Sequence, residues 1–223
     1  MNKILTFDCY GTLIDTLPFY NEIGKIGLEL GLDGKKMIEI FINYEDRLMY
    51  GENYRKLSDL IYRTLEYCEF ELNCDKIKTE FERLIEKHRE LLPFDEVKDT
   101  LLTLKSNGYK LAILSNSERS IMDYNLKSLE VDLDYVLLSE DLKCYKPQIE
   151  FFHQAKKKLN LNKNSHIHIA AGFWWDIVPA SSCNWNTIWV NRNNKKGIKA
   201  YLPYTEIKNL DEVIYQADKI LKS

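Results

Sequence analysis

Four stretches of this sequence place a polar side chain of a catalytically useful type at or soon after the end of an apolar run. These side chains are Asp8, Ser115, Asn116, Lys146 and Asp176. A carboxylate can attack carbon or phosphorus and form a covalent intermediate that water later hydrolyses. A nearby lysine keeps such a carboxylate ionised, and a second acid can orient or deprotonate the water. The alternative is a set of unrelated capping or salt-bridge residues, but their consistent position favours one site.

The elements that must position these residues alternate between strand-like and helix-like segments. Apolar runs typical of buried strands occur at 4–7, 110–114, 135–138, 166–170 and 187–190, and we expect the last run to complete the sheet. Helices are expected between them at 96–106, from about 119, and at 148–159. Strands separated by such helices indicate right-handed βαβ units and a parallel sheet, at whose carboxyl ends ligands bind. The pattern predicts an α/β, Rossmann-like core.

Between the first two strands lies a long segment with helical periodicity alone. Three amphipathic stripes begin at Met37, Leu57 and Ile77. We therefore expect a core formed by residues 1–15 and 93–223 and an inserted helical domain formed by residues 16–92. Hinges near 14–18 and 88–94 would let the insert close over Asp8 and exclude water.

The motifs FDCYGTLID, LAILSNS, CYKP and the WWD segment together resemble the four motifs of the haloacid dehalogenase superfamily, in order and across essentially the whole chain. The helical insert is similar to that family's cap domain. The resemblance implies that Asp8 is the nucleophile and that Thr12 holds its loop. It further implies that Ser115 and Asn116 anchor the substrate. Lys146 would be the charge partner and Asp176 the fourth-motif acid.

Tyr10 bears on the choice between branches of this superfamily. Its phosphatases have a second aspartate two residues after the nucleophile, which protonates the leaving alkoxide. A tyrosine at this position is similar to the 2-haloacid dehalogenases and to a related branch that opens azetidine-2-carboxylate. Because a halide leaves without needing a proton, Tyr10 favours attack on carbon of a small 2-substituted carboxylate through an aspartyl ester, without a metal or other cofactor.

Two alternatives remain open. A magnesium-dependent small-molecule phosphatase would use Asp8, the backbone carbonyl at Tyr10 and Asp176 as metal ligands. A non-catalytic binding protein on the same fold would explain Ala171 and Phe173, because known 2-haloacid dehalogenases carry a serine and an asparagine there.

Further residues are assigned less directly. Phe152 stands where those dehalogenases have a tyrosine. Arg47 is the expected cap residue for a substrate carboxylate, with Arg55 as the alternative, and Trp175 is the aromatic residue expected in the pocket. His166 and His168 are interpreted as histidines at a sheet edge and not as a metal pair, because no third ligand is evident. We expect Asp15 to cap the hinge.

Composition excludes several classes of function. The formal net charge of −3 gives no reason to expect nucleic acid or a membrane surface as a partner, and no apolar run is long enough to span a bilayer. The 5 cysteines are scattered without a C-x-x-C pair, so we expect reduced thiols in a cytoplasmic protein. The expected partner is a small-molecule substrate, and the family resemblance leaves a homodimer open.

Overall fold

A parallel β-sheet forms the core of the protein. The computed structural model describes residues 3–51 and 53–222 and contains a six-stranded sheet in the order β3-β2-β1-β4-β5-β6. The strands are β1 (Ile4–Phe7), β2 (Lys110–Ser115), β3 (Tyr135–Leu138), β4 (His166–Ala170), β5 (Asn186–Val190) and β6 (Thr205–Ile207). Every neighbouring pair is parallel. The expected Rossmann-like α/β fold is confirmed, and its strand order reverses direction at β1, where ligands bind in such sheets.

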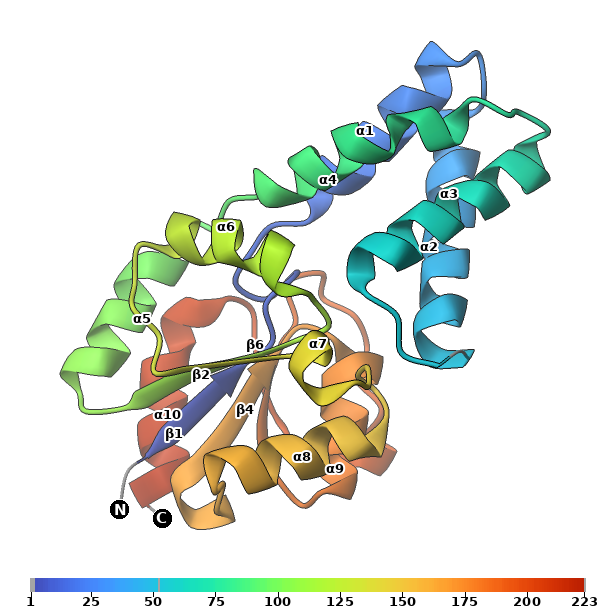
Figure 1. Cartoon of the computed structure of the whole chain (residues 1–223). Coiled ribbons are helices and arrows are strands. Elements are labelled where there is room, and N and C mark those ends of the chain that lie inside the picture. The colour runs from blue at the N-terminus through green and yellow to red at the C-terminus, as the bar shows by residue number, and fades with distance from the viewer. Residues whose placement is uncertain (1–2, 52, 223) are drawn as a thin grey trace.

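Helices cover both faces of this sheet (Figure 1). The core helices are α5 (Val97–Ser106), α6 (Arg119–Leu129), α7 (Ser139–Leu142), α8 (Ile149–Leu159), α9 (Val178–Ser182) and α10 (Val213–Lys222). Side chains alternate along each strand, so each strand serves two faces. Leu5 and Phe7 pack with α5, α6 and α10, whereas Ala112 and Leu114 pack with α8 and α9.

Four helices are inserted between β1 and α5: α1 (Leu17–Glu29), α2 (Gly34–Gly51), α3 (Leu57–Leu72) and α4 (Phe81–Arg89). In Figure 1, α1 and α4 run side by side away from the sheet, and α2 packs against α3 next to them. The three expected stripes lie on these elements, although Ile77 belongs to a separate 3-10 turn, η1 (Ile77–Glu80). The other 3-10 turns are η2 (Lys163–Ser165), η4 (Lys199–Tyr201) and η5 (Leu210–Glu212).

The chain enters and leaves this helical insert at adjacent points. Ile14 and Pro93 form an antiparallel bridge, flanked by hydrogen bonds from Asp15 N to Leu92 O (2.9 Å) and from Phe94 N to Leu13 O (3.0 Å). The Asp15 carboxylate accepts a hydrogen bond from Leu17 N, which agrees with a capping role at the start of α1. The two connections to the helical insert therefore lie side by side.

Two sequence-based expectations about the sheet were wrong. The run at 187–190 does not complete it, because β6 and α10 follow; β6 has only 3 residues and gives too short a pattern to recognise. His166 and His168 do not lie at a sheet edge, because β4 pairs with both β1 and β5 and both side chains are buried. Strand order depends on how each crossover packs, which local sequence does not encode.

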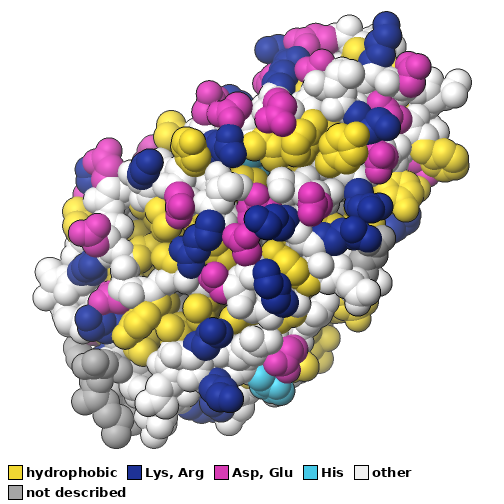
Figure 2. All heavy atoms as spheres, in the orientation of Figure 1, with side chains coloured by type: hydrophobic (Ala, Val, Ile, Leu, Met, Phe, Trp, Pro, Cys, Tyr) yellow, Lys and Arg dark blue, Asp and Glu magenta, His cyan; other side chains and the backbone are white. Residues whose placement is uncertain are grey.

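The outer surface carries charges of both signs. On the face in Figure 2, lysine and arginine side chains are interspersed with aspartate and glutamate. That face therefore offers no single-sign field to a polyanion. Within residues 3–51 and 53–222, no helix is long and apolar enough to cross a membrane.

Candidate active site

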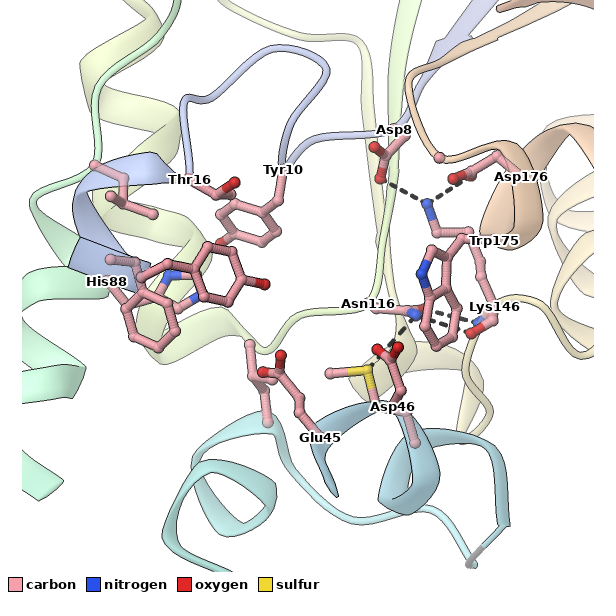
Figure 3. Close-up of a pocket in the computed structure, with 16 residues that line it drawn as sticks. Asp8, Tyr10, Thr16, Glu45, Asp46, His88, Asn116, Lys146, Trp175 and Asp176 are labelled. Atoms are coloured by element: carbon pink, nitrogen blue, oxygen red, sulfur yellow. Dashed lines mark hydrogen bonds and ion pairs between the residues drawn. The ribbon is translucent and has the colours of Figure 1, made fainter. Parts of the chain in front are cut away.

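A cavity lies where the carboxyl ends of the central strands face α2. Its volume is about 160 Å³, so it accommodates only a small molecule. Asp8, Asn116, Lys146 and Asp176 line it from the core, and Glu45 lies across from them on α2 (Figure 3). Four of the five residues from the strand ends are thus brought together, because parallel strands end at one edge.

The centre of the site is a lysine shared by two carboxylates. Lys146 Nζ lies 2.7 Å from Asp8 Oδ1 and 2.7 Å from Asp176 Oδ1, and all three side chains are nine-tenths buried or more. Burial alone would lower the pKa of Lys146, but Asp176 and Asp8 outweigh it and raise that pKa. The ammonium is therefore permanently charged between the two acids.

The two carboxylates differ in their environments. Burial raises the pKa of Asp8, and the charge of Asp176 adds to this effect, while Lys146 and Thr12 oppose it. Burial would also raise the pKa of Asp176, but Lys146 and His168 together hold that pKa below its usual range. Asp176 is consequently the more firmly ionised of the two acids.

The loop after β1 presents Asp8 to the cavity. Asp8 N donates to Ile169 O of β4, and Gly11 adopts a φ of +80°, a conformation that favours glycine. Thr12 Oγ1 donates to Asp8 Oδ2 at 2.7 Å and accepts from Ala171 N at 2.8 Å. The Thr12 hydroxyl therefore fixes one oxygen of Asp8.

A single π-helical turn, η3 (Phe173–Ile177), carries Asp176. His168 Nε2 lies 3.0 Å from Asp176 Oδ1, and Thr6 Oγ1 lies within 2.9 Å of both His168 and His166. A Cβ at Gly172 would lie 2.6 Å from Asp176 Oδ2, so the carboxylate needs glycine at that position. His168 was missed as a site residue; the H-x-H pattern on a strand ahead of Asp176 was the available signal.

Tyr10 lines the cavity, but neighbours hold its hydroxyl. The hydroxyl donates to Asn125 Oδ1 at 2.8 Å and lies 3.2 Å from Ser117 Oγ. Burial raises the pKa of Tyr10 well above its ordinary value, so the phenol stays neutral. The group at the position of the phosphatases' second acid is thus neutral and engaged within the protein.

The carboxylate oxygens that could hold a magnesium ion at this site belong to Asp8 and Asp176. Mg²⁺ binds proteins through one or two carboxylates and keeps several waters, and here Asp8 Oδ1 and Asp176 Oδ1 both also bond the Lys146 ammonium. Asp176 Oδ2 is buried without a partner among the described residues. The described part of the chain contains no group of three His, Cys, Asp or Glu side chains that could hold a metal ion.

A family model of haloacid dehalogenase-like hydrolases matches residues 2–184. The chain belongs to this family. It is 26% identical over 218 residues to an (S)-2-haloacid dehalogenase 4A of Burkholderia cepacia, covering 95% of this chain and 93% of that protein. A crystal structure of a dehalogenase superposes with a TM-score of 0.83 at 25% identity and covers 96% of both chains. A glyceraldehyde 3-phosphate phosphatase of Methanothermobacter thermautotrophicus is 25% identical over 202 residues, 86% of each chain.

The remaining residues predicted for the hydrolase site fall into two groups. Asn116 and Trp175 line the cavity, and the Asn116 amide exchanges two hydrogen bonds with the backbone of Lys146 (2.7 and 2.9 Å). Ser115 does not line the cavity; it is the last residue of β2, and its hydroxyl is buried with no partner among the described residues. Asn116 therefore positions Lys146, whereas Ser115 does not reach the site.

The arginines expected at this hydrolase site do not line the cavity. Arg47 is exposed, with its guanidinium 5.1 Å from the centre of the Tyr44 ring, and Arg55 is half-buried outside the cavity. Instead, α2 directs Glu45 and Asp46 to the cavity, which the sequence-based reasoning missed (Figure 3).

The aromatic residues near the fourth motif also separate. Phe152 packs against Trp185 in the interior, whereas Phe173 is half-buried and packs against Trp189. Trp174 is exposed and lies 6.4 Å, between ring centres, from Tyr50 of α2. Of these aromatic residues, only Trp175 lines the cavity.

Proposed function

We propose that this hydrolase displaces a leaving group from carbon 2 of a small 2-substituted carboxylate, such as a 2-haloacid, with Asp8 as nucleophile. The observation that carries the proposal is the Lys146 ammonium shared by Asp8 and Asp176. It keeps charge on a nucleophile that burial would otherwise neutralise. The names of the dehalogenase relatives support the same chemistry.

In the first step, an Asp8 carboxylate oxygen bonds to carbon 2 of the substrate. The carbon–halogen bond breaks, and the halide leaves with the bonding electron pair. This step needs no proton donor, which agrees with the neutral Tyr10 hydroxyl already engaged by Asn125. Helices α1–α4, within the proposed 16–92 cap, would exclude water during this step.

In the second step, water attacks the carbonyl carbon of the Asp8 ester. Asp176, ionised beside Lys146 and His168, orients this water and accepts its proton. The ester bond breaks, a 2-hydroxy acid leaves, and the Asp8 carboxylate is regenerated with release of one proton. Tyr10, Asn116 and Trp175 are the proposed substrate contacts.

The test is halide release from (S)-2-chloropropionate in the presence of EDTA. We expect release by the parent protein and none by Asp8→Asn. Asp132→Asn, a matched change at an exposed residue, should retain the parent rate. Release of phosphate from a small phosphoester in the presence of magnesium, without release of halide from the haloacid, would favour a phosphatase. The absence of any Asp8-dependent turnover would favour a binding protein. Either result would overturn the proposal.

A further inference from the structure

The charge of the cavity is unusual for a site that receives a simple carboxylate anion. Four carboxyl groups line it, on Asp8, Asp176, Glu45 and Asp46, against the single lysine Lys146. His88 also lines the cavity, but burial lowers its pKa to about 4, so the imidazole is neutral at pH 7. Among the described lining residues, negative charge therefore exceeds positive charge.

The carboxylates on the core side of the cavity have a counter-charge, but those on α2 do not. Lys146 bonds both Asp8 and Asp176. Glu45 is half-buried and Asp46 is exposed on the cavity wall, and neither forms an ion pair or a hydrogen bond with the residues described. Burial and the neighbouring Asp46 raise the pKa of Glu45 to about 8. A raised pKa is expected for a buried carboxyl group that has no positive charge nearby.

Aromatic rings line the same cavity. Phe19 and Tyr20 of α1 line the cavity together with Tyr10 and Trp175. Faces of such rings attract ammonium groups, and they do so more strongly where water is excluded. Carboxyl groups and aromatic faces are the two kinds of protein group that attract a small organic cation.

We propose that the substrate carries an ammonium group, which Glu45 and Asp46 bind on the α2 side while Asp8 attacks the carbon that bears the leaving group. The attack by Asp8 rests on the proposed displacement reaction, whereas the binding of the ammonium group is argued from the cavity alone. The substrate class is therefore a small 2-substituted carboxylate with a protonated amine, and a plain 2-haloacid, which lacks the amine, is a poorer substrate.

The first experiment compares two substrates that differ only by the ammonium group. At pH 7, halide release is measured from 3-amino-2-chloropropionate and from 2-chloropropionate. We expect kcat/KM to be at least tenfold higher for the amino acid, and the double variant Glu45→Gln, Asp46→Asn to reduce this preference at least tenfold through KM. Equal or lower kcat/KM for the amino acid, or a preference unchanged in the double variant, overturns the inference.

A second experiment measures binding without chemistry. Calorimetry compares 3-aminopropionate with propionate, neither of which has a leaving group at carbon 2. Binding of 3-aminopropionate at least tenfold tighter in the parent, and equal binding of both in the double variant, supports the inference; equal binding in the parent overturns it. If neither chloro acid releases halide, the proposed reaction fails, yet this pair of ligands still decides the question of cation binding.

The matched control is Glu39→Gln, which removes one carboxylate from an exposed position of α2. The preference for the ammonium group should survive in this control if the effect is local to the cavity. Loss of the preference in Glu39→Gln would assign it to the general field of the helix and overturn the proposed site.

The pH dependence gives a third readout. An ammonium binds ionised Glu45 better than neutral Glu45, so the preference for 3-aminopropionate should increase as the pH rises through about 8. The other titratable groups that line the same cavity are Asp8, Tyr10, Tyr20, Asp46, His88, Lys146 and Asp176. Glu45→Gln alone should abolish the increase; an increase that persists in this variant would overturn the assignment to Glu45.

Discussion

At this site, the surrounding groups give two aspartates different pKa values. Asp8 and Asp176 share one ammonium, yet burial raises the pKa of Asp8, whereas Lys146 and His168 lower that of Asp176. Two carboxyl groups whose environments separate their pKa values are a common basis for two catalytic roles. The lysine is therefore the residue on which the protonation states of both acids depend.

Replacing this lysine should move the pH profile in a defined direction. The nucleophile must be ionised, so activity is lost as the pH falls through the pKa of Asp8, which burial already raises. In Lys146→Met that pKa rises further, and the acid limb of kcat/KM should move to higher pH. A charge pair at 4 Å contributes about 4 kcal/mol at an effective dielectric of 20, which limits this move to roughly three pH units.

The measurement is the pH–rate profile of halide release. Lys143→Met removes an exposed lysine three residues earlier and should leave the profile unchanged. An acid limb that stays at its original pH in Lys146→Met would contradict the role assigned to Lys146.

A second residue-scale prediction concerns His168. Its imidazole lies 3.0 Å from Asp176 and acts as a positioning residue for that carboxylate. In His168→Gln, hydrolysis of the ester should slow more than its formation, so a covalent adduct on Asp8 should accumulate. Mass spectrometry of protein quenched during turnover measures the adduct. Reduced turnover without any adduct would instead indicate general damage to the site.

At the scale of elements, α6 links the core to the inserted helices. Asn125 on α6 donates to the carbonyls of His88 and Arg89 at the end of α4 (3.1 and 3.2 Å) and accepts from Tyr10. One buried amide therefore joins the loop after β1 to the chain that returns from the inserted helices. Because Asn125 and His88 are buried, hydrogen bonds at this amide are costly to leave unmade.

Asn125→Ala should consequently reduce the free energy of unfolding by about 1–3 kcal/mol. Urea titration followed by circular dichroism measures this change. Asn193→Ala, an exposed asparagine in a loop, should change stability little. A stability equal to that of the parent would show that the carbonyls of His88 and Arg89 find other partners.

At the scale of the whole molecule, the cavity exists only where the inserted helices meet the core. This junction brings Glu45 of α2 into a setting where burial and Asp46 raise its pKa to about 8. A folded-state pKa above the unfolded value means that ionising Glu45 weakens the folded state as the pH rises from about 5 to 8. Functional sites commonly retain groups that reduce stability in this way.

Glu45→Gln should therefore stabilise the protein in a pH-dependent manner. The variant should resemble the parent near pH 5 and become more stable than it toward pH 8, by at most about 1.4 kcal/mol for each pH unit. Unfolding curves at several pH values measure the difference, with Glu39→Gln as the control on the same helix. A difference that does not grow with pH would contradict the raised pKa of Glu45.

The sequence alone determined five of the six strands, their parallel arrangement and most of the residues at the carboxyl edge of the sheet. Asp8, Lys146 and Asp176 each follow a strand, and parallel strands bring residues at their carboxyl ends together, so local pattern sufficed. Tyr10 was recognisable for the same reason, because the short loop after β1 leaves little choice of position. Ser115 was misplaced because it still belongs to its strand.

Only the tertiary structure decided what faces the site from elsewhere. His168 depends on β4 lying inside the sheet, and strand order follows from how the crossovers pack. On α2, successive side chains point about 100° apart, so the rotation of one helix decides whether Arg47 or Glu45 and Asp46 meet the cavity. That rotation is set by packing of α2 against α1 and α3, which are contacts between separate helices that the local pattern of α2 does not specify.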